Sequence, residues 1–166
     1  FLHWKFTNYS TNPDFGVVDR VQYFPDNLTI AEAVDNEIIN WQTYGQPFWT
    51  PQQAIYNFGF DAAQSGAVAS GYDSLLEGAI QGPVALLFDW KVSSKPSIGQ
   101  LEFYIGNKFK KEISGEVGWT TEKFLIPEGT HTIRWDYYKS APDVSGSDAG
   151  WVDRVQLQPL PPLGVA

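Results

Sequence analysis

Short segments that alternate apolar and polar residues, with turn residues between them, follow one another through most of this chain of 166 residues. A dense apolar run at 82–94, bounded by Gly-Pro and Ser-Ser, predicts a central strand that is buried on both faces. Residues 101–105 and 109–113 predict a hairpin around the turn formed by Gly106 and Asn107. Many short strands at a spacing of about ten residues are typical of two packed antiparallel sheets. The sequence therefore predicts an all-β protein.

Other segments extend this pattern. Two more strands are predicted on either side of the turn-forming Pro127-Glu128-Gly129, and a further strand covers Gly-Trp-Val-Asp-Arg-Val-Gln-Leu-Gln at 150–158. The segment 27–39 allows either a helix or a short strand, because Glu32 follows Thr29 at capping-box spacing but its apolar residues suit both structures.

Composition narrows the function classes. A net charge of −8 would repel a phosphate backbone, so we expect no nucleic-acid partner. The chain has no Cys, which excludes disulfides, thiolate zinc sites and cysteine nucleophiles. It contains no apolar run near the roughly 20 residues of a membrane helix, so we expect no membrane insertion. It also has no Met, so we expect a processed mature protein or a piece of a longer one.

One phrase occurs twice. Residues 14–25 read DFGVVDRVQYFP, and residues 148–159 read DAGWVDRVQLQP. The repeat predicts either a duplicated hairpin within one sandwich or a tandem array with a period of about 130 residues. In the second interpretation 1–25 is the closing hairpin of a preceding repeat, or an extension that pairs with a neighbouring sheet edge. Residues 26–159 then form the sandwich, and 160–166 form a Pro-rich linker.

Several ordered stretches resemble a bacterial jelly-roll module that recurs in large secreted and surface proteins. They are FDAAQSGAV, GPVALLFDWKVSS, LEFYIGNKFKKEISGEVGW, IPEGTHTIRWDYYK and SGSDAGWVDRV, and the resemblance covers about residues 35–157. The module is similar to MAM and cleaved-adhesin domains. The resemblance implies a two-sheet antiparallel jelly-roll β-sandwich of the concanavalin type, here with an N-terminal strand or hairpin extension. It also implies a non-catalytic module that lies outside the cell or on its surface.

Related jelly-rolls often hold a structural calcium where the first and last strands meet. Calcium takes six to eight oxygen ligands, and this sequence offers Asp143, Asp148, Asp153 and Asp35 as carboxylate ligands. One departure is Arg154, where many relatives have a second acidic residue. The alternative is that the Asp residues of the 143–148 loop are ordinary turn formers.

Aromatic and amide side chains in 41–53 are candidates for carbohydrate binding, because sugar C–H faces stack on exposed rings. The candidate residues are Trp49, Trp41, Tyr44 and Gln52. The alternative is that these rings belong to the core, but we expect Trp49 in its Pro-rich loop to be at least partly exposed.

We do not expect an enzyme. The carboxylates lack the E-x-D-x-x-E spacing of jelly-roll glucanases, and no G-x-S-x-G motif accompanies the two histidines. The first hypothesis is a structural or adhesion module of a tandem-repeat surface or filament protein, whose partners are adjacent repeats or other copies. The second is a carbohydrate-binding module of a secreted protein that acts on polysaccharides.

Overall fold

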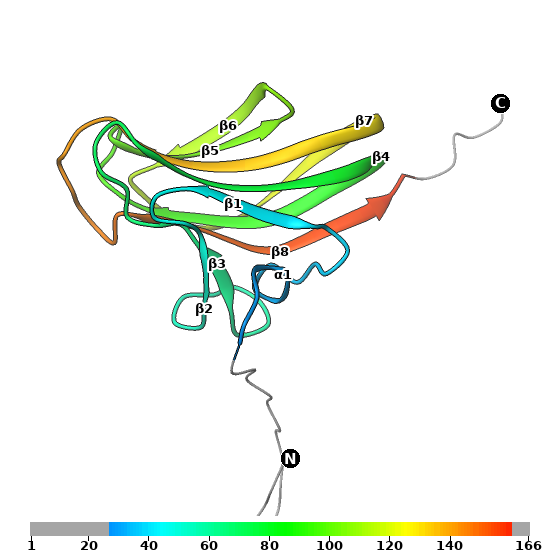
Figure 1. Ribbon diagram of the computed structural model, residues 1–166, viewed down its shortest axis with the longest axis horizontal. Helices are drawn as coiled ribbons and strands as arrows, with labels where there is room; N and C mark the ends of the chain where they lie inside the picture. The colour runs from blue at the N-terminus through cyan, green and yellow to red at the C-terminus, as the bar shows by residue number, and fades with distance from the viewer. Residues whose placement is uncertain (1–26, 161–166) are drawn as a thin grey trace, which may run out of the picture.

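Eight antiparallel strands and one short helix form the part of the chain that the computed structural model describes, residues 27–160 (Figure 1). The predictions for 1–25 and most of the proposed linker lie outside the described residues. The elements are α1 (Ile30–Ala33), β1 (Trp41–Gly45), β2 (Thr50–Gln52), β3 (Ala62–Gln64), β4 (Asp73–Ser93), β5 (Gly99–Ile105), β6 (Lys108–Ser114), β7 (Glu116–Lys139) and β8 (Ala149–Pro159).

Two long strands build both layers of the sandwich. The first half of β4 pairs with the second half of β7, and the second half of β4 pairs with the first half of β7. Both strands bend where Gly82 lies opposite Gly129, and the ladder shifts its register there. The upper layer in Figure 1 therefore holds β1, β5, β6 and one half of this two-stranded ribbon, and the lower layer holds β2, β3, β8 and the other half.

The core lies between the two layers and is rich in aromatic rings. The ring of Phe88 on β4 packs 4.8 Å from that of Phe103 on β5 and 4.9 Å from that of Trp135 on β7, measured between centroids. All three side chains are fully buried. Because they belong to opposite layers, they close the sandwich, and the predicted two-sheet antiparallel jelly-roll is confirmed.

Most predicted strands are confirmed, and one predicted turn takes a different form. The hairpin of β5 and β6 turns at Gly106 and Asn107 as expected, and β8 covers the repeated phrase. Pro127-Glu128-Gly129 lies where the ribbon folds over, so the chain turns back there from one layer to the other, but both flanking segments stay paired with β4 and count as one long strand. The helix is only four residues long, although Thr29 and Glu32 form the expected capping box.

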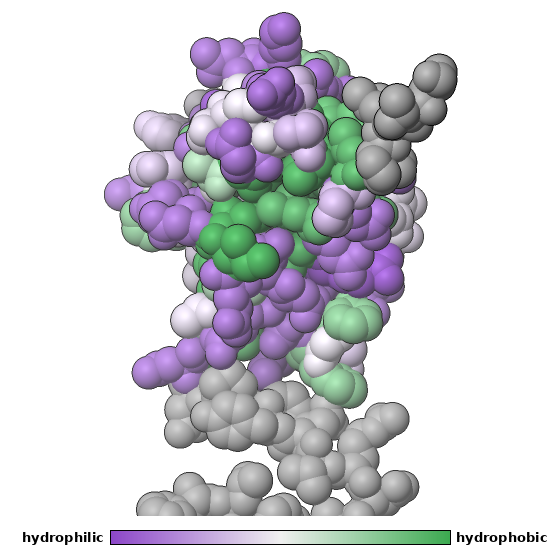
Figure 2. All heavy atoms as spheres, turned by 90° about the vertical axis from the view of Figure 1, so that its right-hand side faces the viewer, coloured by the Kyte–Doolittle hydropathy of each residue, from purple (hydrophilic) through white to green (hydrophobic). Residues whose placement is uncertain are grey.

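The bent end of the sandwich faces the viewer in Figure 2, which shows apolar side chains gathered across its middle between more polar zones. Leu125 on β7 is 66% exposed, the largest exposure of an apolar side chain in that strand. Within residues 27–160 no helix has the length and apolar character that crossing a membrane requires.

Candidate functional site

The outer face of the upper layer carries polar and aromatic side chains in register across four strands. Leu76, Trp135 and Phe103 point into the core, so their neighbours in sequence point outward. Pairing places Gln42 opposite Glu77 and Glu77 opposite Arg134, with Arg134 in turn opposite Tyr104. We call this surface the polar-aromatic face; its residues are Gln42, Tyr44, Glu77, Glu102, Tyr104, Arg134 and Asp136.

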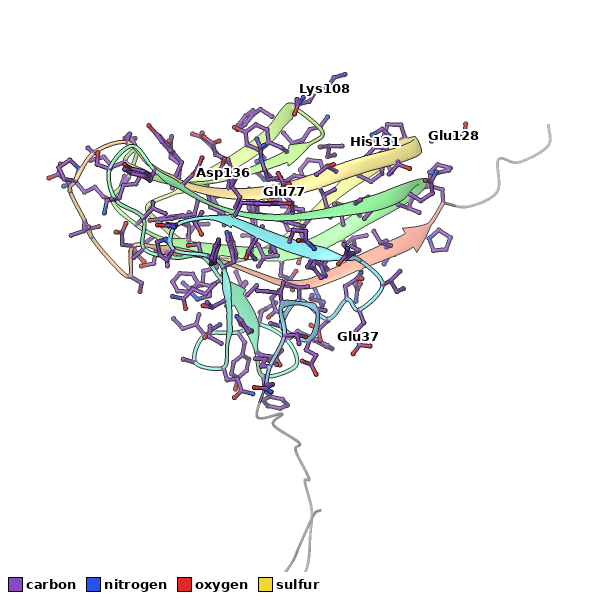
Figure 3. The ribbon with its side chains drawn as sticks, in the orientation of Figure 1. Glu37, Glu77, Lys108, Glu128, His131 and Asp136 are labelled. Carbon is purple, nitrogen blue, oxygen red and sulfur yellow. The ribbon has the colours of Figure 1, made fainter. Side chains whose placement is uncertain are left out.

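Electrostatics on this face are dominated by carboxylates around one cation. Arg134 lies 3.8 Å from Glu77 in an ion pair, and its guanidinium carbon is 4.3 Å from the ring centroid of Tyr104. Burial and the charges of Asp73 and Glu102 raise the pKa of Asp136 to about 7. Figure 3 shows Asp136 and Glu77 on neighbouring strands of the upper layer. The face therefore offers both hydrogen-bond donors and acceptors beside aromatic rings.

A groove adjoins this face along β1. A hollow of about 600 Å³ lies between α1 and β1 and is lined in part by Trp41 and Phe48. A second hollow of about 220 Å³ includes Glu77, and the two hollows share Asn40 and Gln42. Phe48 is 53% exposed and Tyr44 is 47% exposed. Asn40 and Gln42 thus connect the groove to the polar-aromatic face.

The four predicted sugar-binding residues do not gather in one place, and the two on β1 point to opposite sides of that strand, with Trp41 packed against Trp135 and Tyr44 exposed. Trp41 lines the groove with its indole N–H donated to the carbonyl of Asn36, and Tyr44 stands on the outer face. The expectation that Trp49 is partly exposed is wrong, because its ring is 2% exposed and its Nε1 donates to the carbonyl of Ser74. Gln52 uses its amide within its own loop, bonding backbone groups of Ala54, Ile55 and Ala62.

Asp35 and Asp153 meet where the first described segment reaches the last strand. Asp153 is fully buried; its Oδ2 accepts hydrogen bonds from the backbone N–H groups of Asn57 and Phe58, while its Oδ1 has no partner. Burial and the charge of Asp153 raise the pKa of Asp35 to about 7. Two carboxylates that share a site in this way stabilise a bound proton or cation between them.

A third carboxylate lies close to this pair. Burial and the charge of Asp153 raise the pKa of Asp61. A Cβ placed on Gly59 would come within 3.2 Å of Asp35 Oδ1 and 3.6 Å of Asp61 Oδ1, so the backbone of Gly59 approaches both acids. No three His, Cys, Asp or Glu side chains within 27–160 form a ready metal-ligand group, so a cation here would need backbone carbonyl and water ligands too. The buried Oδ1 of Asp153, which has no hydrogen-bond partner, is a suitable carboxylate ligand for such a cation.

The other two predicted calcium ligands lie elsewhere. Asp148 accepts a hydrogen bond from Tyr137 and forms an ion pair with Lys139 at 2.6 Å, and Asp143 is exposed in its loop. Five residues of extended strand separate Asp148 from Asp153 by about 16 Å. One ion cannot bind both, so of the four predicted ligands only Asp35 and Asp153 lie together.

Neither a known sequence family nor a curated protein matches the chain. Several solved structures do resemble it in fold. The secreted serine protease VesC from Vibrio cholerae shares 16% identity with a TM-score of 0.60 over 78% of this chain and 26% of that one. The carbohydrate-binding module TmCBM61, solved with β-1,4-galactotriose, shares 11% identity with a TM-score of 0.55 over 84% of this chain and all of its own.

A third similar structure is the K3 cleaved adhesin domain of Lys-gingipain from Porphyromonas gingivalis w83. It shares 12% identity with a TM-score of 0.52 over 71% of this chain and 91% of that one. At such identities these similarities show the fold alone. They confirm the sandwich expected from the likeness to cleaved-adhesin domains. This chain spans only about a quarter of VesC, so the similarity covers one part of that protease.

Some residues of the candidate sites could not be singled out from the sequence. Glu77, Arg134 and Asp136 sit at outward positions of alternating strands, but they form one face only once β4 and β7, which lie far apart in sequence, are paired in this register. Asp61 stands just before a short strand and resembled a turn residue. For Glu77, Arg134 and Asp136 the alternation of polar and apolar residues in the strands was a usable signal in the sequence. Asp61 had no such local signal.

Proposed function

We propose that this chain is a non-catalytic carbohydrate-binding module of a secreted protein, and that its ligand lies across β1 on the polar-aromatic face. The observation that supports this most is that the groove lined by Phe48 and the hollow that includes Glu77 share Asn40 and Gln42, while the exposed ring of Tyr44 lies on the same side of β1 as Gln42. Sugars present C–H faces to aromatic rings and hydroxyls to amides and carboxylates. A shallow, open site of this kind suits a chain-like glycan.

Binding to a panel of immobilised polysaccharides tests the proposal, followed by titration calorimetry with the best oligosaccharide. Tyr44→Ala removes an exposed ring, and Glu77→Gln removes a charge from the rim of the small hollow. We expect each to weaken binding about tenfold, which corresponds to about 1.4 kcal/mol.

Leu125→Ala serves as the matched control, because it shortens a side chain that is 66% exposed on the other half of β7. It should leave affinity unchanged. Failure of the native chain to bind any glycan, or equal affinity in all three variants, would contradict the proposal.

Calcium binding by Asp35 and Asp153 is the second part of the proposal. The unpartnered, buried Oδ1 of Asp153 supports it, together with the unfavourable closeness of the two carboxylates. An ion here would tie the segment around Asp35, the loop at Asn57 and β8 together, and it would supply structural rather than catalytic chemistry.

Thermal unfolding in calcium and in a chelator tests this part. Calcium at about one hundred times its dissociation constant should raise Tm by about 5–10 °C. Asp153→Asn and Asp35→Asn should each abolish the rise. Asp143→Asn should keep it, because that carboxylate lies in an exposed loop away from the pair. An unchanged Tm in calcium for the native chain would refute the site.

The alternative function, a spacer or adhesion module in a tandem-repeat or filament protein, is favoured by the repeated phrase at 14–25 and 148–159. It does not exclude glycan binding. Electron micrographs of a polypeptide that carries several such units in tandem would support it if they show head-to-tail chains, and dispersed single particles would count against it.

A further inference from the structure

Phe109 on β6 carries the polar-aromatic face on to a fifth strand. Its ring is 52% exposed and packs edge-on against the ring of Tyr104, with 5.7 Å between the two centroids. The two residues are paired in the β5–β6 ladder, so both side chains stand on the same side of the upper layer. Lys108, the residue before Phe109, is labelled at the tip of this hairpin in Figure 3. An accessible ring therefore lies at the end of the face that is farthest from β1.

A row of paired residues leads across the strands from β1 to this ring. Its members, taken in order from β1, β4, β7, β5 and β6, are Gln42, Glu77, Arg134, Tyr104 and Phe109. Neighbouring strands lie about 4.8 Å apart, so the row spans about 19 Å. One sugar unit of an extended glycan advances by roughly the spacing between two strands, so a chain of about four units matches the row.

Side chains in the row contact one another from Glu77 to Phe109. The guanidinium of Arg134 pairs with Glu77 at 3.8 Å, and its carbon lies 4.3 Å from the ring centroid of Tyr104. The ring of Tyr104 in turn supports that of Phe109. Because each side chain is held by its neighbour, a ligand that lies along the row has few side chains to order, and this favours binding.

Hydrogen-bond acceptors follow the same course in a second row beside the first. Pairing places Asp136 on β7 opposite Glu102 on β5, and Glu102 opposite Glu112 on β6. Asp136 and Glu102 are half-buried, and Glu112 is exposed. Carboxylates accept hydrogen bonds from hydroxyl groups. Rings and acceptors thus continue together as far as β6, which suits a hydroxyl-rich chain rather than a single sugar near β1.

We infer that the glycan of the proposed function is an extended chain of about four or more sugar units, and that Phe109 binds its far end. The chain crosses the strands from the hollows at β1 to the hairpin of β5 and β6. A disaccharide occupies only the part of the face near β1. This inference rests on the proposed function and adds Phe109 to the binding residues.

Titration calorimetry with oligosaccharides of two to six units, taken from the polysaccharide that the native chain binds best, tests the inference. We expect affinity to rise with each added unit up to about four and then to level off. Phe109→Ala removes a stacking ring, so it should lower the affinity for the tetrasaccharide about tenfold and leave that for the disaccharide unchanged. Phe109→Tyr keeps a ring and should retain the native affinity.

Phe58→Ala is the matched control, because the ring of Phe58 is 50% exposed in the loop between β2 and β3 of the lower layer. This variant should bind every oligosaccharide as the native chain does. If the native chain binds no polysaccharide, the proposed function fails and the inference fails with it. If the native chain binds but its affinity levels off at two units, or if Phe109→Ala binds the tetrasaccharide as tightly as the native chain, the inference alone is overturned.

Discussion

Arg154 shows how a single residue can hold an irregular strand in place. Its backbone is left-handed at the point where the pairing of β8 with β4 shifts register. Its guanidinium forms an ion pair with Asp89, whose side chain is 1% exposed. Thr121 and Asn57 donate the remaining hydrogen bonds to Asp89. Arg154 therefore neutralises a buried acid on the neighbouring strand and leaves Asp153 free to face Asp35.

Removing the guanidinium of Arg154 should strongly destabilise the fold. Arg154→Ala leaves Asp89 buried without its partner charge, and we expect a loss of about 3 kcal/mol in the free energy of unfolding. Arg134→Ala, which breaks a longer pair with the partly exposed Glu77, should cost about 1 kcal/mol or less. Urea denaturation of the two variants measures both values. Equal losses would show that burial of Asp89 does not decide the effect.

Acid groups with raised pKa values give the stability a definite pH dependence. Asp35 and Asp136 each have a folded-state pKa of about 7, above the ordinary value of about 4 in the unfolded chain. Between these values the folded state binds more protons, so stability falls as pH rises from about 4 to 7. In a chelator the urea midpoint should be higher at pH 5 than at pH 8.

Asp35→Asn together with Asp136→Asn should flatten this dependence, and calcium should reduce the contribution of Asp35 in the native chain. A native midpoint that is higher at pH 8 than at pH 5 in chelator would contradict the assignment.

Residue identity alone could not tell which aromatic rings are exposed. Trp41 and Trp49 lie in similar polar surroundings in the sequence, yet Trp49 enters the core while Trp41 lines a groove. The indole N–H of Trp49 donates to the carbonyl of Ser74, 25 residues further along the chain, and such a distant partner leaves no local signal in the sequence. The pairing of Asp35 with Asp153 was among the predicted ligands, but Asp143 and Asp148 were grouped with it only because calcium ligands are short-spaced in many loops.

Elements were more predictable than sites. The strands β5, β6 and β8 follow from alternation and turn residues, which are local signals. The continuity of β7 through Pro127 could not be predicted, because it depends on β4 bending at the same level and keeping the two strands paired.

The bend of β4 and β7 requires a glycine at position 82. A Cβ on Gly82 would lie 1.8 Å from the carbonyl oxygen of Pro127, and a backbone atom cannot rotate away. Gly82→Ala should therefore lower the free energy of unfolding by about 3 kcal/mol. Gly118→Ala is the control, because the corresponding Cβ meets nothing within 4 Å, and it should change stability by less than about 0.5 kcal/mol. Thermal or urea unfolding separates the two.

The whole molecule is closed by contacts between its two described ends. The backbone N–H of Val155 on β8 donates to the carbonyl of Val34, and the side chain of Asn36 donates to the carbonyl of Val155. The Asp35–Asp153 pair lies between these bonds, so the proposed ion would sit at the seam where the chain returns to its start. The acidic pair and the hydrogen bonds that join the first described segment to β8 therefore lie in the same region of the lower layer.

The ribbon shared by both layers has a mechanical consequence. A pull on the two ends of the sandwich cannot peel one sheet from the other, because β4 and β7 belong to both and stay bonded to each other along nearly their whole length. Tension would instead load the seam between Val34 and Val155 together with the aromatic core that joins the two layers, so we expect both layers to give way together. Extension of single molecules by force spectroscopy should accordingly show one rupture per module, whereas two successive ruptures would mean that the layers carry load separately.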